Sequence, residues 1–126
     1  MKKLPLAKKK KVSKTRLKNK LDALFSKHIR KVGYCQAEGK LKGKCGGGLQ
    51  TAHIEGRINY RLRWNEMNVL CLCAGHHRYA HAHPLEFFEF VLEYYPEKYS
   101  YINKHKHEIV KMTPDLYKKM IEHYGN

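Results

Sequence analysis

The sequence predicts one small domain of the α+β class, in which two short strands lie between N-terminal and C-terminal helices. Three observations favour this prediction. Apolar residues recur at helical steps near both ends of the chain, two short apolar runs occupy the middle, and a glycine-rich stretch with two cysteines precedes the first run. With 126 residues the chain is long enough for one modest core.

Positive charge is concentrated at the N-terminus. The chain has 26 Lys and Arg against 11 Asp and Glu, a formal net charge of +15, and the first carboxylate is Asp22. We expect residues 1–14 to form a flexible basic arm and residues 15–126 to form the domain. Such an arm binds polyphosphates by releasing their counterions. A nucleic acid is therefore the predicted partner, ahead of a solubilising role or a membrane surface.

No apolar run approaches the ~18 residues that a membrane-spanning helix needs, and the Lys-rich start lacks the apolar stretch of a secretory signal. We therefore expect a cytoplasmic protein that does not associate with membranes. Disulfides are rare in reducing compartments, so the four cysteines are interpreted as metal ligands.

The first helix is predicted from Ser13 to about Gly33, with a cationic face opposite its apolar face. Its apolar residues recur at steps of three and four: Leu17, Leu21, Leu24, Phe25, Ile29 and Val32. Residues 34–48 hold five glycines together with Cys35 and Cys45, a composition that favours a tight loop.

Two apolar runs, residues 49–54 and 69–73, are predicted to form paired strands joined by a long polar loop. That loop contains Trp64, which we expect to be a core anchor rather than a base-stacking residue. A helix over residues 74–83 should end at Pro84. Further helices are expected over residues 85–95, 98–112 and 114–124, the last with Thr113 as its N-cap and Gly125 beyond its end.

Four residues predict a structural zinc site. Cys35 and Cys45 lie on glycine-rich backbone, and Cys73 and His76, with two residues between them, lie at the step from the second strand into a helix. Two pairs of soft or borderline ligands suit tetrahedral Zn²⁺. Cys71 competes for the same role, although only Cys73 begins a Cys-x-x-His step. The alternative is that these are small buried core cysteines.

A second cluster of histidines lies nearby in the sequence. His77 and His81 are four residues apart, so both would lie on one helix face and could reach one ion. His53 ends the first predicted strand. Two strands followed by a helix could bring His53 opposite His77, with Asn68 beside them.

The order of His53, Asn68, Cys73 and His77 resembles the HNH endonuclease motif of the ββα-metal (His-Me finger) superfamily. Asn68 precedes Cys73 by five residues and His77 by nine, which is the spacing of that motif. The surrounding sequence is similar to phage recombination nucleases of the NinG/Rap-like group. The resemblance spans roughly residues 15–90 and implies a ββα-metal (HNH) finger with a zinc knuckle, flanked by helices.

The resemblance also implies the chemistry, which is metal-dependent hydrolysis of phosphodiester bonds in DNA, in phage recombination or DNA processing within the host cytoplasm. His53 matches the general base, and Asn68 matches the residue that braces the loop carrying it. His77 and His81 match ligands of a catalytic divalent ion such as Mg²⁺, Mn²⁺ or Ni²⁺. The candidate DNA-binding residues are the arginines of this region: Arg57, Arg61, Arg63 and Arg78.

Two positions depart from the family pattern. His76 replaces a knuckle cysteine, and Ala52 stands where many members carry a metal ligand. Two imidazoles without an oxygen ligand favour Mn²⁺, Ni²⁺ or Zn²⁺ over Mg²⁺. Ala52 leaves open a non-catalytic, zinc-stabilised DNA-binding module, and a structural or assembly role is a third alternative. A homodimer also stays open, and no small-molecule cofactor is expected.

Overall fold

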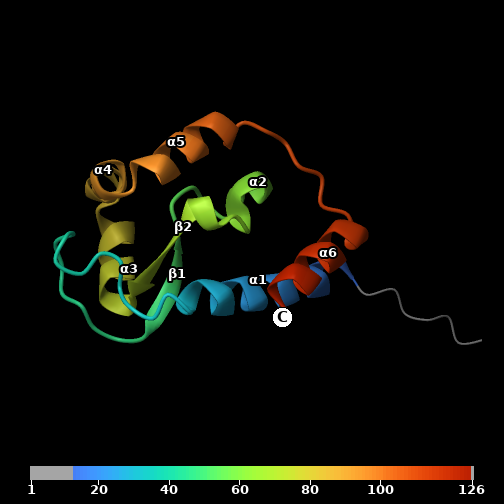
Figure 1. Cartoon of the computed structure of the whole chain (residues 1–126), viewed down its shortest axis with the longest axis horizontal. Helices are drawn as coiled ribbons and strands as arrows, with labels where there is room; N and C mark the ends of the chain where they lie inside the picture. Colours follow the sequence, from blue (N-terminus) through green and yellow to red (C-terminus); the bar gives the residue numbers. More distant parts are fainter. Residues whose placement is uncertain (1–12, 126) are drawn as a thin grey trace, which may run out of the picture.

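The computed structural model describes residues 13–125. The elements follow one another as α1 (Lys14–Arg30), β1 (Leu49–His53), α2 (Tyr60–Arg63), the 3-10 helix η1 (Glu66–Asn68), β2 (Val69–Cys73), α3 (Ala74–Ala82), α4 (Pro84–Tyr94), α5 (Pro96–His105) and α6 (Pro114–Tyr124) (Figure 1). The predicted α+β class is confirmed. Of the predicted basic arm, residues 1–12 lie outside the described residues.

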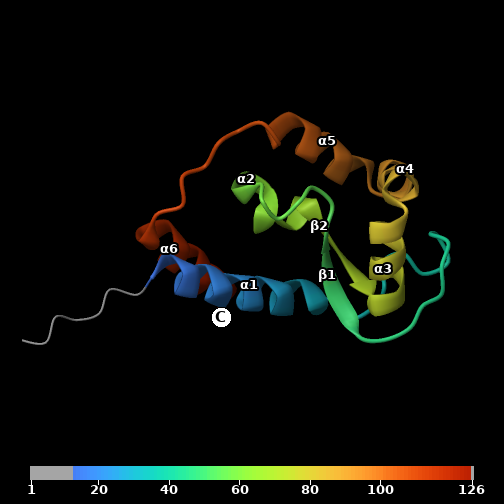
Figure 2. The same ribbon diagram turned by 180° about the vertical axis from the view of Figure 1, so that it is seen from behind.

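Helix α1 begins where its sequence predicts. The hydroxyl of Ser13 accepts a hydrogen bond from the backbone N–H of Arg16, which caps the first turn. The helix buries its apolar side, and Gly33 follows its end with a φ of 84°, in the left-handed region that favours glycine. Helix α6 packs alongside α1, as both Figure 1 and Figure 2 show.

Strands β1 and β2 form an antiparallel pair in which His53 lies opposite Val69 and Leu49 lies opposite Cys73. All five residues of β2 are buried. Val69 and Cys71 belong to the apolar core beside α1, whereas Leu70 and Leu72 belong to the core beside α4 and α5. Because β2 is covered on both faces, it has the continuous apolar run seen in the sequence.

The segment between the strands is partly structured, and Trp64 within it is a core residue, as predicted. Its indole ring packs edge-on against Tyr117 of α6, at 5.5 Å between ring centroids. Trp64 therefore joins the β1–β2 connection to the α1–α6 core.

The predicted helix over residues 98–112 is wrong in its second half. Helix α5 begins at Pro96, because proline suits the first helical position. It ends at His105, whose imidazole bonds Glu108 while its backbone carbonyl accepts from the Glu108 N–H in a turn. Beyond that turn Ile109 is 96% exposed, while Val110 and Met112 pack against the α1–α6 core. These two packed residues are two apart, a spacing that does not place them on one helix face.

No helix within residues 13–125 combines the length and the apolar character that a membrane crossing requires. The longest, α1, carries lysine and arginine on its exposed side.

Candidate functional site: a metal centre and a histidine-lined groove

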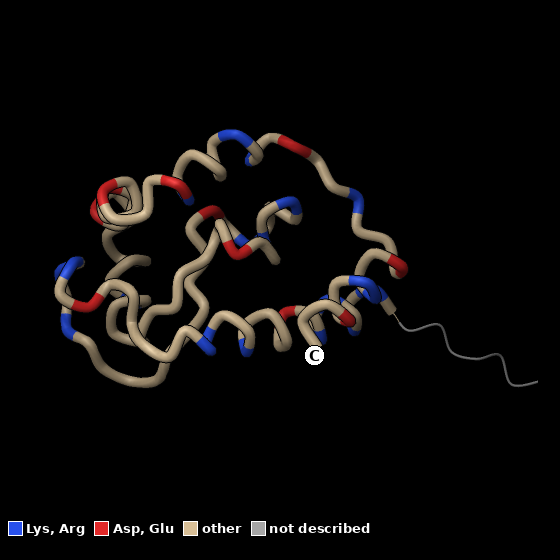
Figure 3. The backbone as a smooth tube through the Cα atoms, viewed as in Figure 1, with Lys and Arg blue, Asp and Glu red and all other residues tan. Residues whose placement is uncertain are grey.

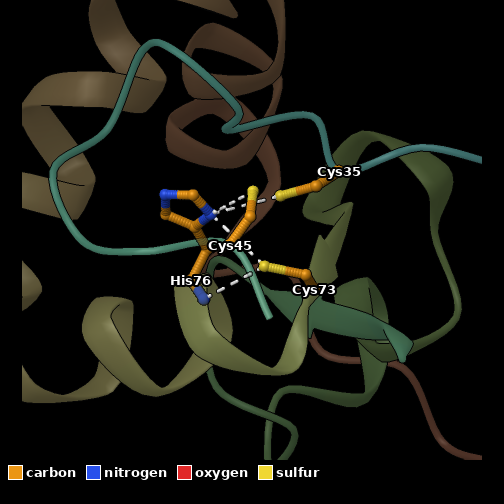
Figure 4. A group of neighbouring side chains, drawn as sticks. All are labelled: Cys35, Cys45, Cys73 and His76. Carbon is orange, nitrogen blue, oxygen red and sulfur yellow. Dashed lines mark hydrogen bonds between the residues drawn. The ribbon is translucent and has the colours of Figure 1, made fainter. Parts of the chain in front are cut away.

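Cys35, Cys45, Cys73 and His76 meet where the glycine-rich loop returns to the start of α3 (Figure 4). Their ligand atoms all lie within 4.8 Å of one another. Nδ1 of His76 lies 3.4, 3.2 and 3.3 Å from the sulfurs of Cys35, Cys45 and Cys73. In a tetrahedral zinc site, bond lengths of about 2.3 Å to sulfur and about 2.1 Å to nitrogen place these atoms about 3.5 Å apart. The four predicted ligands are therefore close enough to hold a metal ion such as zinc.

The protonation of His76 favours a metal ion over a hydrogen-bonded cluster. Its Nε2 lies 3.2 Å from the carbonyl oxygen of Leu41, which can only accept, so Nε2 donates. In the neutral ring, Nδ1 then presents a lone pair to three sulfurs at once. One lone pair cannot satisfy three thiols, whereas a cation can bind that nitrogen together with three thiolates.

The thiol pKa values support the same conclusion. Burial raises the pKa of Cys73, but hydrogen bonds from the backbone N–H groups of His76 and Gly46 outweigh it and hold the pKa at about 6. Partial desolvation and the neighbouring sulfurs of Cys73 and Cys35 raise the pKa of Cys45 to about 12. Sulfurs this close cannot all ionise unless a cation joins them.

Glycines allow the loop to approach α3. A Cβ at Gly75 would lie 2.3 Å from the carbonyl oxygen of Lys44, and one at Gly47 would lie 2.7 Å from the side chain of Ala74. The backbone N–H of Gly75 also donates to Gly46 over 2.9 Å. Cys71 is outside the cluster, buried in the core beside α1, so it does not compete with Cys73.

A groove of about 770 Å³ lies next to this centre, lined by α1, β1 and α3. His53, His77 and His81 all line it, and the same three histidines line a smaller pocket of about 180 Å³ toward Phe87 and Phe88. The groove therefore brings together the histidines that the sequence singled out. Within the described part of the chain, the Cys and His cluster above is the one group of three or more potential ligands whose atoms converge.

His53 is held in one tautomer. Its Nε2 lies 2.8 Å from the carbonyl oxygen of Arg63, so Nε2 donates and Nδ1 keeps a lone pair. Burial lowers the pKa of His53, and the positive charges of Arg57 and Arg63 lower it further, against opposing effects of that hydrogen bond and of Asp22. A neutral imidazole with one free acceptor nitrogen has the form that a general base requires.

Asn68 is fully buried beneath the segment that follows His53. Its amide oxygen accepts from the backbone N–H of Glu55 over 2.8 Å, and its amide nitrogen donates to the carbonyl oxygens of Glu55 and Leu62, each over 3.1 Å. One side chain thus satisfies three backbone groups of the connection between the strands, two of them on Glu55, which lies two residues after His53.

On α3, the rings of His77 and His81 lie 4.9 Å apart between centroids. Nδ1 of His77 lies 2.7 Å from Oε1 of Gln50. Burial and the neighbouring His81 lower the pKa of His77. The two rings are therefore adjacent, and a neutral His77 would offer Nε2 to an ion.

The four candidate DNA-binding arginines separate into two groups. Arg57 lines the groove, and its side chain is 59% exposed. Arg78 is exposed on α3 and forms no ion pair with any residue in the described range. These two residues remain accessible to a phosphate.

Arg61 and Arg63 do not line the groove, and the prediction that Arg63 contacts DNA is wrong. Arg63 is buried at 8% exposure because Asp22 accepts two of its hydrogen bonds. Arg61 pairs with Glu108 over 2.8 Å and also donates to Tyr101. Both side chains hold the β1–β2 connection against other elements of the fold.

Sequence reasoning missed three groove residues, Asp22, Arg30 and Gln50. Asp22 and Arg30 lie four residues on either side of Ser26, a spacing that places all three on one side of α1 and could have been read from the sequence. Gln50 had no such signal, because its contact with His77 depends on how α3 packs against β1.

No protein-family model, curated protein or solved structure matches the chain.

Proposed function

We propose that the chain is a metal-dependent DNA endonuclease with an HNH-type ββα-metal finger, built on a structural zinc ion. The observation that carries the proposal is the meeting, in one groove, of a tautomer-fixed His53 with the adjacent pair His77 and His81. The strand-strand-helix order that delivers them, β1, β2 and α3, matches the sequence motif that implies this activity.

In the proposed reaction, Nδ1 of His53 takes a proton from a water molecule as its oxygen attacks the phosphorus of a phosphodiester. The bond from phosphorus to the 3′ oxygen breaks, and the leaving oxygen takes a proton from a solvent water molecule, which leaves 5′-phosphate and 3′-hydroxyl ends. His77 and His81 would hold the divalent ion, which supplies charge neutralisation for the leaving oxygen. Arg57 is placed to bind a non-bridging phosphate oxygen at the groove wall.

The ligand set bears on the choice of ion. Ala52 is 1% exposed in the core beside α4, so this position gives the groove no oxygen ligand. Water molecules would complete the coordination around His77 and His81. We therefore propose Mn²⁺ or Ni²⁺ ahead of Mg²⁺ as the ion that best supports activity.

A cationic stripe on α1 supports DNA as the substrate. Arg16, Lys20, Lys27 and Arg30 are exposed and recur at steps that keep them on one side of the helix. None of the four forms an ion pair within residues 13–125. Figure 3 shows lysine and arginine positions recurring along the α1 backbone. The stripe ends at the groove because Arg30 lines it. Such a row attracts a phosphate backbone regardless of base sequence.

The test is plasmid cleavage by zinc-loaded protein with added Mg²⁺, Mn²⁺ or Ni²⁺. We expect nicking that depends on the added ion and that is lost in His53→Ala and in His77→Ala. His107→Ala, at an exposed histidine two residues beyond the end of α5, is the matched control and should cut normally. Equal cutting by His53→Ala and the parent would show that the assignment of the base is wrong.

The second candidate function is a zinc-stabilised DNA-binding module without catalysis, and Ala52 is the observation that favours it. Such a module would bind DNA in a salt-dependent manner and show no nicking with any of the three ions. If cutting is observed, a panel of plain, nicked, flapped and branched duplexes then identifies the preferred DNA structure.

A further inference from the structure

We infer that Asp22 is a positioning residue for His53 and acts on it through Arg63 and Trp64. The inference rests on the proposed function, because it concerns the residue that would serve as general base. Asp22 is the one acidic residue of α1, and it lies in the wall of the groove.

The carboxylate of Asp22 binds the side chains of two consecutive residues of the β1–β2 connection. Oδ1 accepts from Nε of Arg63 over 3.0 Å and from Nε1 of Trp64 over 2.8 Å. Oδ2 accepts from Nη2 of Arg63 over 2.6 Å. One carboxylate on α1 therefore fixes the side chains on both sides of the peptide bond that joins Arg63 to Trp64.

The carbonyl oxygen of that same peptide bond is the acceptor for Nε2 of His53, over 2.8 Å. A further hydrogen bond, from Nη1 of Arg63 to the carbonyl oxygen of Arg57, ties the connection together over 3.0 Å. The direction of the Arg63 carbonyl thus depends on two side chains, and both are held by Asp22.

The chemical consequence concerns the tautomer of His53. While the carbonyl accepts from Nε2, the ring proton stays on Nε2 and Nδ1 can take a proton from water. If the peptide rotates away, the proton can move to Nδ1, and Nδ1 is then no longer a base. Asp22 would therefore affect the rate of the chemical step without touching the substrate.

Asp22 also contacts Arg57, but less closely. A single hydrogen bond of 3.1 Å joins them, and the Arg57 side chain is largely exposed. If Arg57 moves onto a phosphate, Asp22 keeps its three bonds to Arg63 and Trp64. Substrate binding and base positioning can therefore occur together.

The test compares Asp22→Asn with the parent protein. Asparagine keeps the shape of the side chain but replaces one acceptor oxygen with a donor, which cannot bind the Arg63 guanidinium. Glu108→Gln is the matched control, because it removes a carboxylate from the Arg61 ion pair outside the groove. Thermal unfolding and zinc content verify that each variant is folded.

The first readout is the tautomer of His53, measured by nitrogen NMR on histidine-labelled protein and assigned with His53→Ala. We expect the Nε2–H form in the parent and in Glu108→Gln, and a mixture of the two forms in Asp22→Asn. The second readout is kinetic. We expect kcat to fall about 10- to 100-fold in Asp22→Asn with KM nearly unchanged, a smaller loss than the roughly 10²- to 10⁴-fold that general acid–base catalysis contributes, because the base is mispositioned rather than removed.

Two further variants keep the inference testable if Asp22→Asn does not fold. Trp64→Phe removes one of the three bonds and should shift the tautomer and kcat in the same direction by less. Asp22→Glu keeps the charge and should recover part of the activity. An unchanged His53 tautomer in both Asp22→Asn and Trp64→Phe overturns the inference, even if His53 proves essential for cleavage. A changed tautomer in a protein whose His53→Ala variant still cuts supports the positioning role and overturns the proposed function instead.

Discussion

Gln50 of β1 and His77 of α3 are joined by a hydrogen bond of 2.7 Å between Oε1 and Nδ1. Because the amide oxygen accepts, Nδ1 of His77 carries the proton and Nε2 is the nitrogen left to bind a metal. Gln50 lies three residues before His53 in the same strand. One five-residue strand therefore carries the proposed base and also orients the proposed metal ligand.

We predict that Gln50→Ala weakens binding of the second divalent ion about 10-fold, because partners that orient a ligating histidine contribute about 10- to 100-fold to metal affinity. Calorimetric titration of Mn²⁺ or Ni²⁺ into zinc-loaded protein measures this change. Asn19→Ala, at an exposed position of α1, is the control and should bind like the parent. Equal affinity in Gln50→Ala would mean that this hydrogen bond does not orient His77.

Cys45→Ser should remove the structural zinc ion. Cys45 is exposed, so the substitution disturbs little packing and its effect reports on metal binding. We expect less than one zinc per chain by elemental analysis, and a Tm lower by at least about 10 °C, which corresponds to a loss of roughly 3 kcal/mol.

Cys71→Ala is the matched control for the zinc prediction. Cys71 is buried outside the cluster, so this variant loses some core packing but should retain one zinc per chain. Loss of zinc from Cys71→Ala, or its retention in Cys45→Ser, would contradict the ligand assignment.

Charge removal at the groove should lower the salt dependence of DNA binding. Each phosphate contact contributes about 0.9 to the slope of log K against log salt on duplex DNA. We therefore expect Arg30→Gln and Arg57→Gln each to lower that slope by about one, measured by fluorescence anisotropy in a His53→Ala background. Arg61→Gln, whose side chain is paired with Glu108, should leave the slope unchanged. A drop of the same size in Arg61→Gln would contradict a DNA path through the groove.

The pH dependence of cleavage follows from the direction of the His53 pKa. A general base acts when it is deprotonated, so activity falls as pH drops below its pKa, by about tenfold per pH unit. Burial holds the His53 pKa below the usual 6.5. With saturating metal, we expect kcat/KM to be level near pH 7 and to decline only below pH 6.5. A decline that begins above pH 7 would point to another group as the base.

Local features were predictable from the sequence because their causes are local. The steps of three and four that place Leu17, Leu21 and Phe25 on one face fixed α1, and Thr113 caps α6 through the backbone N–H of Leu116. The Cys73 and His76 half of the metal centre needed only the turn from β2 into α3. Glycine-rich backbone was enough to bring Cys35 and Cys45 to it.

The features that sequence reasoning missed depend on contacts between distant segments. Arg63 lies in a polar loop, and this position predicted an exposed cation. Its hydrogen-bond partner Asp22 is 41 residues away on α1, and the contact between them buries the Arg63 side chain. The end of α5 could not be located for a related reason, because the segment after His105 packs Val110 and Met112 against the α1–α6 core at a spacing of two rather than along a helix face. Which side chains become buried determined both the position of Arg63 and the end of α5, and a local sequence pattern does not contain that information.

His76 and His77 are consecutive residues in the first turn of α3, so the scaffold ion and the proposed catalytic ion would be bound from one turn of helix. A chelator strong enough to remove the ion from the groove would therefore also remove the structural zinc ion and destabilise the fold. Quenching by EDTA, the customary evidence for a metal-dependent nuclease, would report on both ions at once. Restoring activity with one metal at a time, while counting zinc atoms per chain, separates the two contributions.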